Sequence, residues 1–229
     1  MRTFLLAALA LLAVPAQAAT RNFGVEGFDR IRVDGPFKVK LTTGVAPFAK
    51  ATGSAIALER VALDLQGRTL VVHVNQSSWG GYPGAAPGPV EIALGTHELS
   101  GAAVNGSGSL EINRITGLKF DLSVQGSGDA MVGTSDVDQL RITLFGNAST
   151  TVSGRAATLT AFQRGITSLN AGGLTIKDAT IGAEGGSTTS AAVTNSAKIT
   201  ASGSATVTLT GNPSCTVRAN GSASVSGCH

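Results

Sequence analysis

A glycine-centred turn recurs along the chain at nearly fixed spacing. It is clearest at 105–108 (NGSG) and 125–128 (QGSG), and it returns near the end at 220–223 (NGSA). The glycines at the corresponding positions, separated by 20, 20, 19, 20, 18 and 18 residues, are Gly106, Gly126, Gly146, Gly165, Gly185, Gly203 and Gly221. A fixed period of this length is typical of a solenoid, in which each repeat forms one coil and stacks on its neighbour.

Between the turns, apolar residues alternate with polar ones, as at Leu110 and Ile112 and again at Leu118, Phe120 and Leu122. A period of two rich in β-branched residues indicates a β-strand with one buried face. Gly, Ser and Thr crowd every segment and no apolar stripe of helical period is present, which disfavours helix. The repeat therefore predicts an all-β, single-domain parallel β-helix (a β-solenoid) with coils of 18–20 residues. Seven coils are expected, each about 4.8 Å further along the axis.

The spacing also predicts a register. Asp121 and Arg141 are 20 residues apart, one coil, so their side chains should meet on neighbouring strands. Residues 23–74 alternate less regularly, best at 37–41 and 70–74, and are expected to form the N-terminal coils and a cap. Toward the C-terminus Ala, Ser and Val replace Leu, Ile and Phe, so the core should become thinner there.

The first 18 residues have the pattern of a secretory signal peptide. Arg2 supplies the charged start, residues 4–14 the apolar segment, and Ala16-Gln17-Ala18 a small-residue cleavage site. An apolar stretch of about 11 residues is too short to span a membrane, which needs about 20. We therefore predict a cleaved leader at 1–18 and one β-solenoid domain at 19–229, exported to the periplasm or the cell surface and extracellular space.

The charge balance, the two cysteines and the few histidines limit which partners and ligands the chain is expected to bind. The chain has 17 Lys and Arg against 14 Asp and Glu, and removal of a leader containing Arg2 lowers the net charge from +3 to +2. Because this excess is small and no run of basic residues is present, nucleic-acid binding is not predicted. Export makes an oxidising compartment the expected environment, so Cys215 and Cys228 are predicted to pair and to staple the last coil. Three scattered histidines give no metal site, and neither metal nor cofactor is predicted.

Two further stretches accompany the repeated Gly-Ser-Gly turns: FDRIRV at 28–33 and FKVKL at 37–41. Together they resemble the autotransporter-adhesin head GIN domain, a bacterial envelope family of unknown function, over roughly residues 23–226. The resemblance implies a right-handed β-helix and an exported location, and it supplies no catalytic residues.

Catalytic patterns are missing from the sequence. No Ser has Gly two positions before and two positions after it, as a nucleophile elbow requires. A polysaccharide-cleaving β-helix would need two carboxyl groups about 5–9.5 Å apart. The residue one coil after Glu111 is Met131, and the residue expected one coil after Asp136 is Ala156, so neither carboxyl group is expected to face a second one. The sequence therefore predicts that the protein is not an enzyme.

What remains is a non-catalytic envelope or surface module, adhesion-like, that binds a glycan or a surface protein. The one long interruption of the strand pattern, residues 76–89, holds the sole Trp and the sole Tyr, Trp79 and Tyr82. Loops on rigid scaffolds commonly carry function, and large amphipathic rings make effective contacts, so these two residues are the predicted binding residues. The same rings could instead cap the N-terminal end of the solenoid. A purely structural envelope protein and a polysaccharide-processing enzyme remain alternatives.

Overall fold

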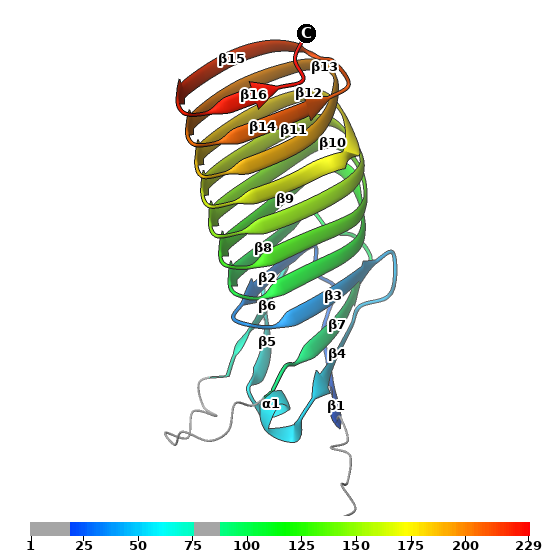
Figure 1. Ribbon diagram of the computed structural model, residues 1–229. Coiled ribbons are helices and arrows are strands. Elements are labelled where there is room, and N and C mark those ends of the chain that lie inside the picture. Colours follow the sequence, from blue (N-terminus) through cyan, green and yellow to red (C-terminus); the bar gives the residue numbers. More distant parts are fainter. Residues whose placement is uncertain (1–18, 76–87) are drawn as a thin grey trace, which may run out of the picture.

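The computed structural model describes residues 19–75 and 88–229. The predicted leader at 1–18 lies outside the described residues, and so do Trp79 and Tyr82, which fall within 76–87. The protein is nearly all β, with 75% of residues in strands and 3% in helix, and it forms a single parallel β-solenoid of about 6 turns (Figure 1). The predicted fold class is therefore confirmed.

Long bent strands form the coils, one strand to each coil through most of the solenoid. These strands are β9 (Ser109–Gly126), β10 (Asp129–Gly146), β11 (Ser149–Gly165), β12 (Ser168–Gly185) and β13 (Thr188–Gly203). The last complete coil is divided into β14 (Thr206–Thr210) and β15 (Ser214–Gly221), and β16 (Ser224–Ser226) begins a further coil by pairing with β14. Each coil pairs with the next in parallel, and the ribbons rise in order toward the C-terminus in Figure 1.

The seven glycines of the repeat stand in one column, each paired in register with the next. All seven have positive φ, between +74° and +112°, a backbone conformation that favours glycine. Close approach between coils is the second requirement, since a methyl group on Gly146 would lie 2.8 Å from the carbonyl oxygen of Gly126. Seven glycines at one corner enclose six turns between them, so the expected count of seven coils is too high by about one.

The inward residues form one continuous apolar core. Phe120 and Leu122 are buried, as the alternation predicted, but Leu118, placed on the same face by that alternation, is 78% exposed. Leu118 follows Gly117, whose positive φ of +134° lies at a bend of the strand. Toward the C-terminus the core contains polar groups as well as small ones: buried Gln163 donates a hydrogen bond from Nε2 to Oγ1 of Thr189 and accepts one at Oε1 from Thr167 Oγ1 (3.2 Å). Buried polar groups that are mutually hydrogen-bonded avoid most of the cost of leaving water.

The solenoid begins with strands separated in sequence. Strands β2 (Arg30–Asp34) and β3 (Lys38–Thr43) form the first coil, and β8 (Gly101–Gly106) fits between β2 and β9. On the N-terminal side, β6 (Thr69–Val74) pairs in parallel with β2, and β7 (Glu91–Thr96) pairs in parallel with β3. Part of the 23–74 segment therefore does form coils.

The remainder of that segment differs from the expected simple coils. Strands β5 (Val61–Gln66), β4 (Phe48–Gly53) and β1 (Ala19–Phe23) continue the sheet edges antiparallel, and a short helix, α1 (Ala55–Glu59), joins β4 to β5 (Figure 1). This short helix lies outside the repeats, where the sequence disfavoured helix. Ser54 accepts a hydrogen bond from the Ala57 N–H at 3.2 Å, and a Ser N-cap before good helix formers was a readable signal.

The two cysteines lie at the C-terminal end of the solenoid. Cys215 in β15 and Cys228 after β16 form a disulfide, with their Cα atoms 5.6 Å apart. The bond joins the last complete coil to the chain segment that follows it, at the C-terminal end where the sequence predicted it.

Candidate functional site

A polar hollow runs along one side of the solenoid, over the strand segments that precede the glycine column. Each coil contributes two outward residues there, and the register places each of them beside its equivalent in the next coil. In chain order these pairs are Lys119 and Asp121, Gln139 and Arg141, Thr158 and Thr160, Asp178 and Thr180, Ser196 and Lys198, and Ser214 and Thr216.

Three adjoining depressions make up this hollow, which we call the axial groove. The first, of about 280 Å³, lies over β2, β8, β9 and β10, and the last, of about 420 Å³, lies over β11, β12, β13 and β15. A small one of about 40 Å³ connects them: it shares Arg141 with the first and Thr158 and Thr160 with the last. The axial groove therefore crosses nearly the whole length of the solenoid.

Hydroxyl groups dominate the C-terminal half of the axial groove. Ser196 lies beside Asp178 on the neighbouring strand, and Thr180 lies beside Lys198 in the same way. Hydrogen bonds from Ser196 Oγ (2.5 Å) and Asn195 Nδ2 (2.6 Å) lower the pKa of Asp178 below its usual value, so this carboxylate stays ionised. This half of the groove thus offers donors, acceptors and both signs of charge to a ligand rich in hydroxyl groups.

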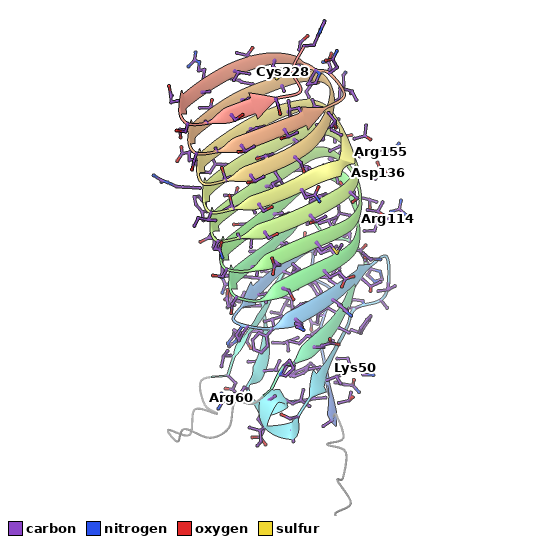
Figure 2. The ribbon with its side chains drawn as sticks, viewed as in Figure 1. Lys50, Arg60, Arg114, Asp136, Arg155 and Cys228 are labelled. Carbon is purple, nitrogen blue, oxygen red and sulfur yellow. A yellow bond between two sulfur atoms is a disulfide. The ribbon has the colours of Figure 1, made fainter. Side chains whose placement is uncertain are left out.

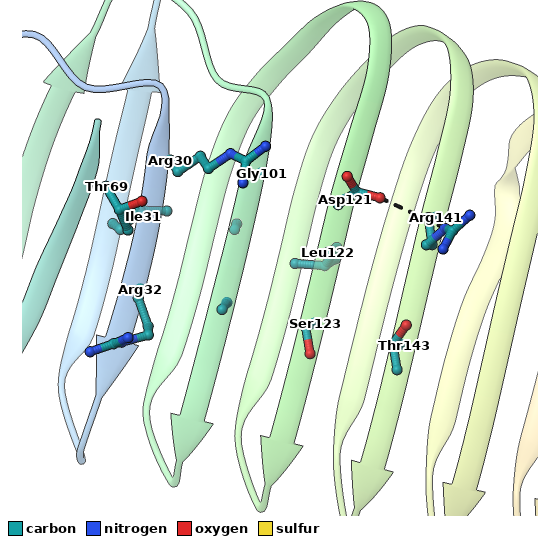
Figure 3. A pocket seen from close by; sticks show the side chains of 12 residues that line it. Arg30, Ile31, Arg32, Thr69, Gly101, Asp121, Leu122, Ser123, Arg141 and Thr143 are labelled. Carbon is teal, nitrogen blue, oxygen red and sulfur yellow. Dashed lines mark ion pairs between the residues drawn. The ribbon is translucent and has the colours of Figure 1, made fainter. Parts of the chain in front are cut away.

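Arginine side chains surround the N-terminal half of the axial groove (Figure 3). Arg141 contacts Asp121 at 3.8 Å, and Lys119 approaches the same carboxylate at 3.0 Å. The contact between Asp121 and Arg141 confirms the register that their spacing predicted. On the other side of the hollow, Arg30 extends from β2 over Gly101, whereas Arg32 on the same strand points the opposite way and pairs with Asp34.

A second charged cluster lies at another edge of the coils, where Arg114, Asp136 and Arg155 project (Figure 2). Arg155 donates to both carboxylate oxygens of Asp136, from Nε at 2.6 Å and from Nη2 at 2.9 Å. These hydrogen bonds, with the positive charge of Arg114, lower the pKa of Asp136. The expected neighbour, Ala156, is wrong: the coil is one residue shorter here, and an irregularity between Val132 and Ser135 shifts the register to Arg155.

Asp136 is therefore held by a guanidinium and is not paired with a second carboxyl group. His73 is similarly engaged, since its Nε2 lies 2.6 Å from Asp64 Oδ2. Within residues 19–75 and 88–229, no three His, Cys, Asp or Glu side chains gather in a way that could hold a metal ion. In the same residues no helix has the length and apolar character to cross a membrane.

The axial groove was not predicted from the sequence, although two signals for it were present. Polar residues recur at the coil spacing on the outward positions, and the outward residues of β8 are the small Gly101 and Ala103, which leave room beside larger neighbours. The predicted binding residues, Trp79 and Tyr82, cannot be related to the groove because they lie outside the described residues.

A parallel β-solenoid covered at its N-terminal end, with a polar groove along one side, defines the structural class. Within that class, the family model described as "Putative auto-transporter adhesin, head GIN domain" matches residues 27–213. The chain belongs to this family, as the resemblance of its turns and first strands predicted.

Solved structures share the fold. A putative adhesin from Bacteroides fragilis superposes with a TM-score of 0.83 at 17% identity, covering 91% of this chain and 96% of that one. A putative lipid binding protein from Parabacteroides distasonis gives 0.73 at 17% identity, covering 93% and 98%. A putative adhesin from Parabacteroides merdae gives 0.69 at 18% identity, covering 92% and 96%. Identities this low establish the common fold alone. Comparison with curated proteins finds no match.

Proposed function

We propose that this protein is an exported, non-catalytic adhesin-type module that binds a surface glycan along the axial groove. The carrying observation is the continuity of the groove, which aligns hydroxyl, amide and charged groups from successive coils on a rigid scaffold. The two outward columns that begin at Lys119 and Asp121 contain no aromatic or large aliphatic side chain, although the half-exposed Phe162 lies in the neighbouring column with Ser123 and Thr143. The polar character of these two columns favours a hydroxyl-rich ligand over an apolar one.

The geometry also suits an extended ligand. Neighbouring coils are separated by about 4.8 Å, so equivalent groups repeat along the axis at roughly the length of one sugar unit. A polysaccharide lying parallel to the axis would then meet a new pair of side chains at each coil. Such contacts are individually weak because the groups are exposed to water, and affinity would come from their number.

Export is supported by three features. The leader predicted at 1–18 has the three regions of a secretory signal. The disulfide between Cys215 and Cys228 is typical of a protein that matures in an oxidising compartment. The head-domain family to which the chain belongs is consistent with a position on the outer side of the inner membrane.

The test compares two matched double variants. Thr160→Leu with Thr180→Leu removes two hydroxyls from neighbouring coils inside the groove, whereas Thr188→Leu with Thr206→Leu makes the same change on an adjacent side. All four threonines are exposed, so neither pair should alter folding. Binding of the purified protein to intact bacteria and to a panel of immobilised neutral and acidic polysaccharides would be measured by biolayer interferometry.

We expect the groove variant to lower affinity by about tenfold and the control to leave it unchanged. Equal losses in the two variants would contradict the proposal. A parent protein that binds neither cells nor any polysaccharide would contradict it as well. Cleavage of a bound polysaccharide by the parent protein would overturn its non-catalytic part.

A further inference from the structure

The N-terminal end of the axial groove contains a trough whose floor is made by β8. The outward residues Gly101 and Ala103 scarcely rise above the backbone, while Arg30 stands on the preceding strand and Asp121 on the following one (Figure 3). A methyl group on Gly101 would lie 3.4 Å from the Asp121 carbonyl oxygen and 3.8 Å from Cγ of Arg30. The small size of Gly101 and Ala103 therefore leaves room for the hollow of about 280 Å³.

The cations around the trough outnumber the anions. Arg32 is paired with Asp34 at 2.9 Å, and Asp121 is shared by Lys119 and Arg141. Among the residues that the structure describes, no carboxylate pairs with the remaining guanidinium, that of Arg30.

Arg30 is therefore a free cation at the edge of a hollow. Its side chain extends across Gly101 toward the strand that carries Asp121 (Figure 3). The negative charge of Asp121 is already offset by Lys119 and Arg141, so it opposes an incoming anion only weakly. A guanidinium presents a planar fork of N–H donors that matches the two oxygens of a carboxylate.

The other polar groups of the trough are hydroxyls. Thr69, Ser123 and Thr143 line it together with the arginines. Hydroxyl groups beside a free guanidinium fit a carboxylate carried on a sugar ring better than a carboxylate at the end of a flexible peptide side chain, because the ring's own hydroxyls can be bonded at the same time.

We propose that this trough is a subsite for the carboxylate of a uronic acid unit, with Arg30 as its principal ligand. The proposal rests on the glycan-binding function assigned to the axial groove and adds that the glycan is acidic. A uronic acid bound at β8 would place the rest of the polysaccharide over Arg141 and then over the hydroxyl-rich half of the groove.

The experiment uses oligosaccharides of galacturonic, glucuronic and mannuronic acid, each beside its carboxyl-reduced neutral counterpart. Affinities are measured by calorimetry at one low salt concentration, since attraction between exposed charges is screened by salt. Arg30→Gln removes the free cation. Gly101→Val fills the trough without changing the charge, and the contacts of an added Cβ lie at ordinary van der Waals distance.

The matched control is Arg218→Gln, because Arg218 is a second exposed arginine on the same side of the solenoid, three coils beyond Phe162 in the same outward column. No ion pair joins Arg218 to another described residue, so both substitutions remove one unpaired charge. Circular dichroism and thermal unfolding of each variant confirm that it is folded.

We expect the parent protein to bind at least one acidic oligosaccharide about tenfold more tightly than its neutral counterpart. Arg30→Gln and Gly101→Val should abolish this preference, and Arg218→Gln should retain it. Equal affinity for acidic and neutral forms, or equal losses in Arg30→Gln and Arg218→Gln, would overturn the subsite. Oligoglutamate that binds as tightly as the uronic acids and depends on Arg30 would make the occupant an acidic peptide and would also overturn it.

The two proposals fail in different ways. If neutral oligosaccharides bind and the Thr160 and Thr180 double variant weakens them, the groove is a glycan site and only the uronic acid subsite is wrong. If that double variant binds every glycan like the parent protein, the proposed function of the groove is wrong.

Discussion

Strand pairing differs between the two ends of the solenoid. Before Gly101 the sheet edges are extended by the antiparallel strands β1, β4 and β5, with α1 between them, whereas from Gly101 onward every strand pairs in parallel with the next coil. Antiparallel hairpins need only short local turns, so the N-terminal cap tolerates varied sequence. The parallel coils must bring each backbone against the one before it, and this requires the same small residue at the same corner in every repeat.

The cores of the two regions differ for the same reason. Phe28, Phe37 and Leu70 fill the wider N-terminal end. In the last coils the buried positions are mostly alanine, valine, threonine and serine, and the outermost strand β15 has no fully buried residue at all. The N-terminal end is thus stabilised by buried apolar area, and the C-terminal end by regular stacking and a covalent bond.

The most direct test of this difference is to place a methyl group at one glycine corner in each region and to compare the losses of stability. Gly146→Ala combines positive φ with a contact of 2.8 Å to the Gly126 carbonyl oxygen, and should cost about 3 kcal/mol of unfolding free energy. Gly67→Ala, in the turn between β5 and β6, has positive φ but no atom within 4 Å of the added methyl, and should cost about 1 kcal/mol. Urea unfolding of both variants measures the difference; equal costs would show that stacking contributes nothing at the corner.

Removal of the disulfide should sharpen the contrast. The bond closes a loop of 13 residues, and replacing both Cys215 and Cys228 with Ser is expected to cost about 2–3 kcal/mol, concentrated in the last coil. Hydrogen exchange should then increase in β15 and β16 and remain unchanged in β5 and β6. Faster exchange throughout the chain would contradict a local role for the staple.

The smallest effect is a pH dependence confined to the N-terminal cap. The hydrogen bond to Asp64, opposed by partial burial and aided by the Val74 carbonyl, raises the pKa of His73 above its usual 6.5. A group with a raised pKa in the folded state contributes stability that is fully present below about pH 6.5 and is lost as the pH rises through the folded value. The contribution should be small because the pair is exposed.

Nuclear magnetic resonance titration of the His73 ring would measure this shift directly. Asp64→Asn should return the pKa toward the ordinary value and flatten the change in melting temperature between about pH 6 and pH 8. A pKa that does not respond to Asp64→Asn would contradict the assignment.

Much of this architecture follows from the chain's periodicity. The glycine spacing predicted the parallel β-solenoid and its corner column, and the alternation predicted the buried side of each strand, because both properties repeat with the coil and depend on local sequence. The 20-residue offset of Asp121 and Arg141 predicted their contact for the same reason. To predict the pairing of Cys215 and Cys228, it was enough to infer an oxidising compartment and to note that the chain has two cysteines.

Features that depend on a single irregular coil could not be predicted in this way. A one-residue shortening between β10 and β11 places Arg155 beside Asp136, where a constant period predicted Ala156. The antiparallel cap and α1 lie where the repeat is absent, so the periodicity of the sequence could not predict them. The N-terminal trough of the axial groove exists because small residues on β8 lie between larger ones that are distant in sequence, such as Arg30 and Asp121. The sequence by itself determined most of the inward residues and how the coils stack, since these depend on short-range steric rules; Leu118, which the alternation placed inward, is exposed. Only the tertiary structure decided which outward side chains share a surface, because that depends on the exact number of residues in every coil.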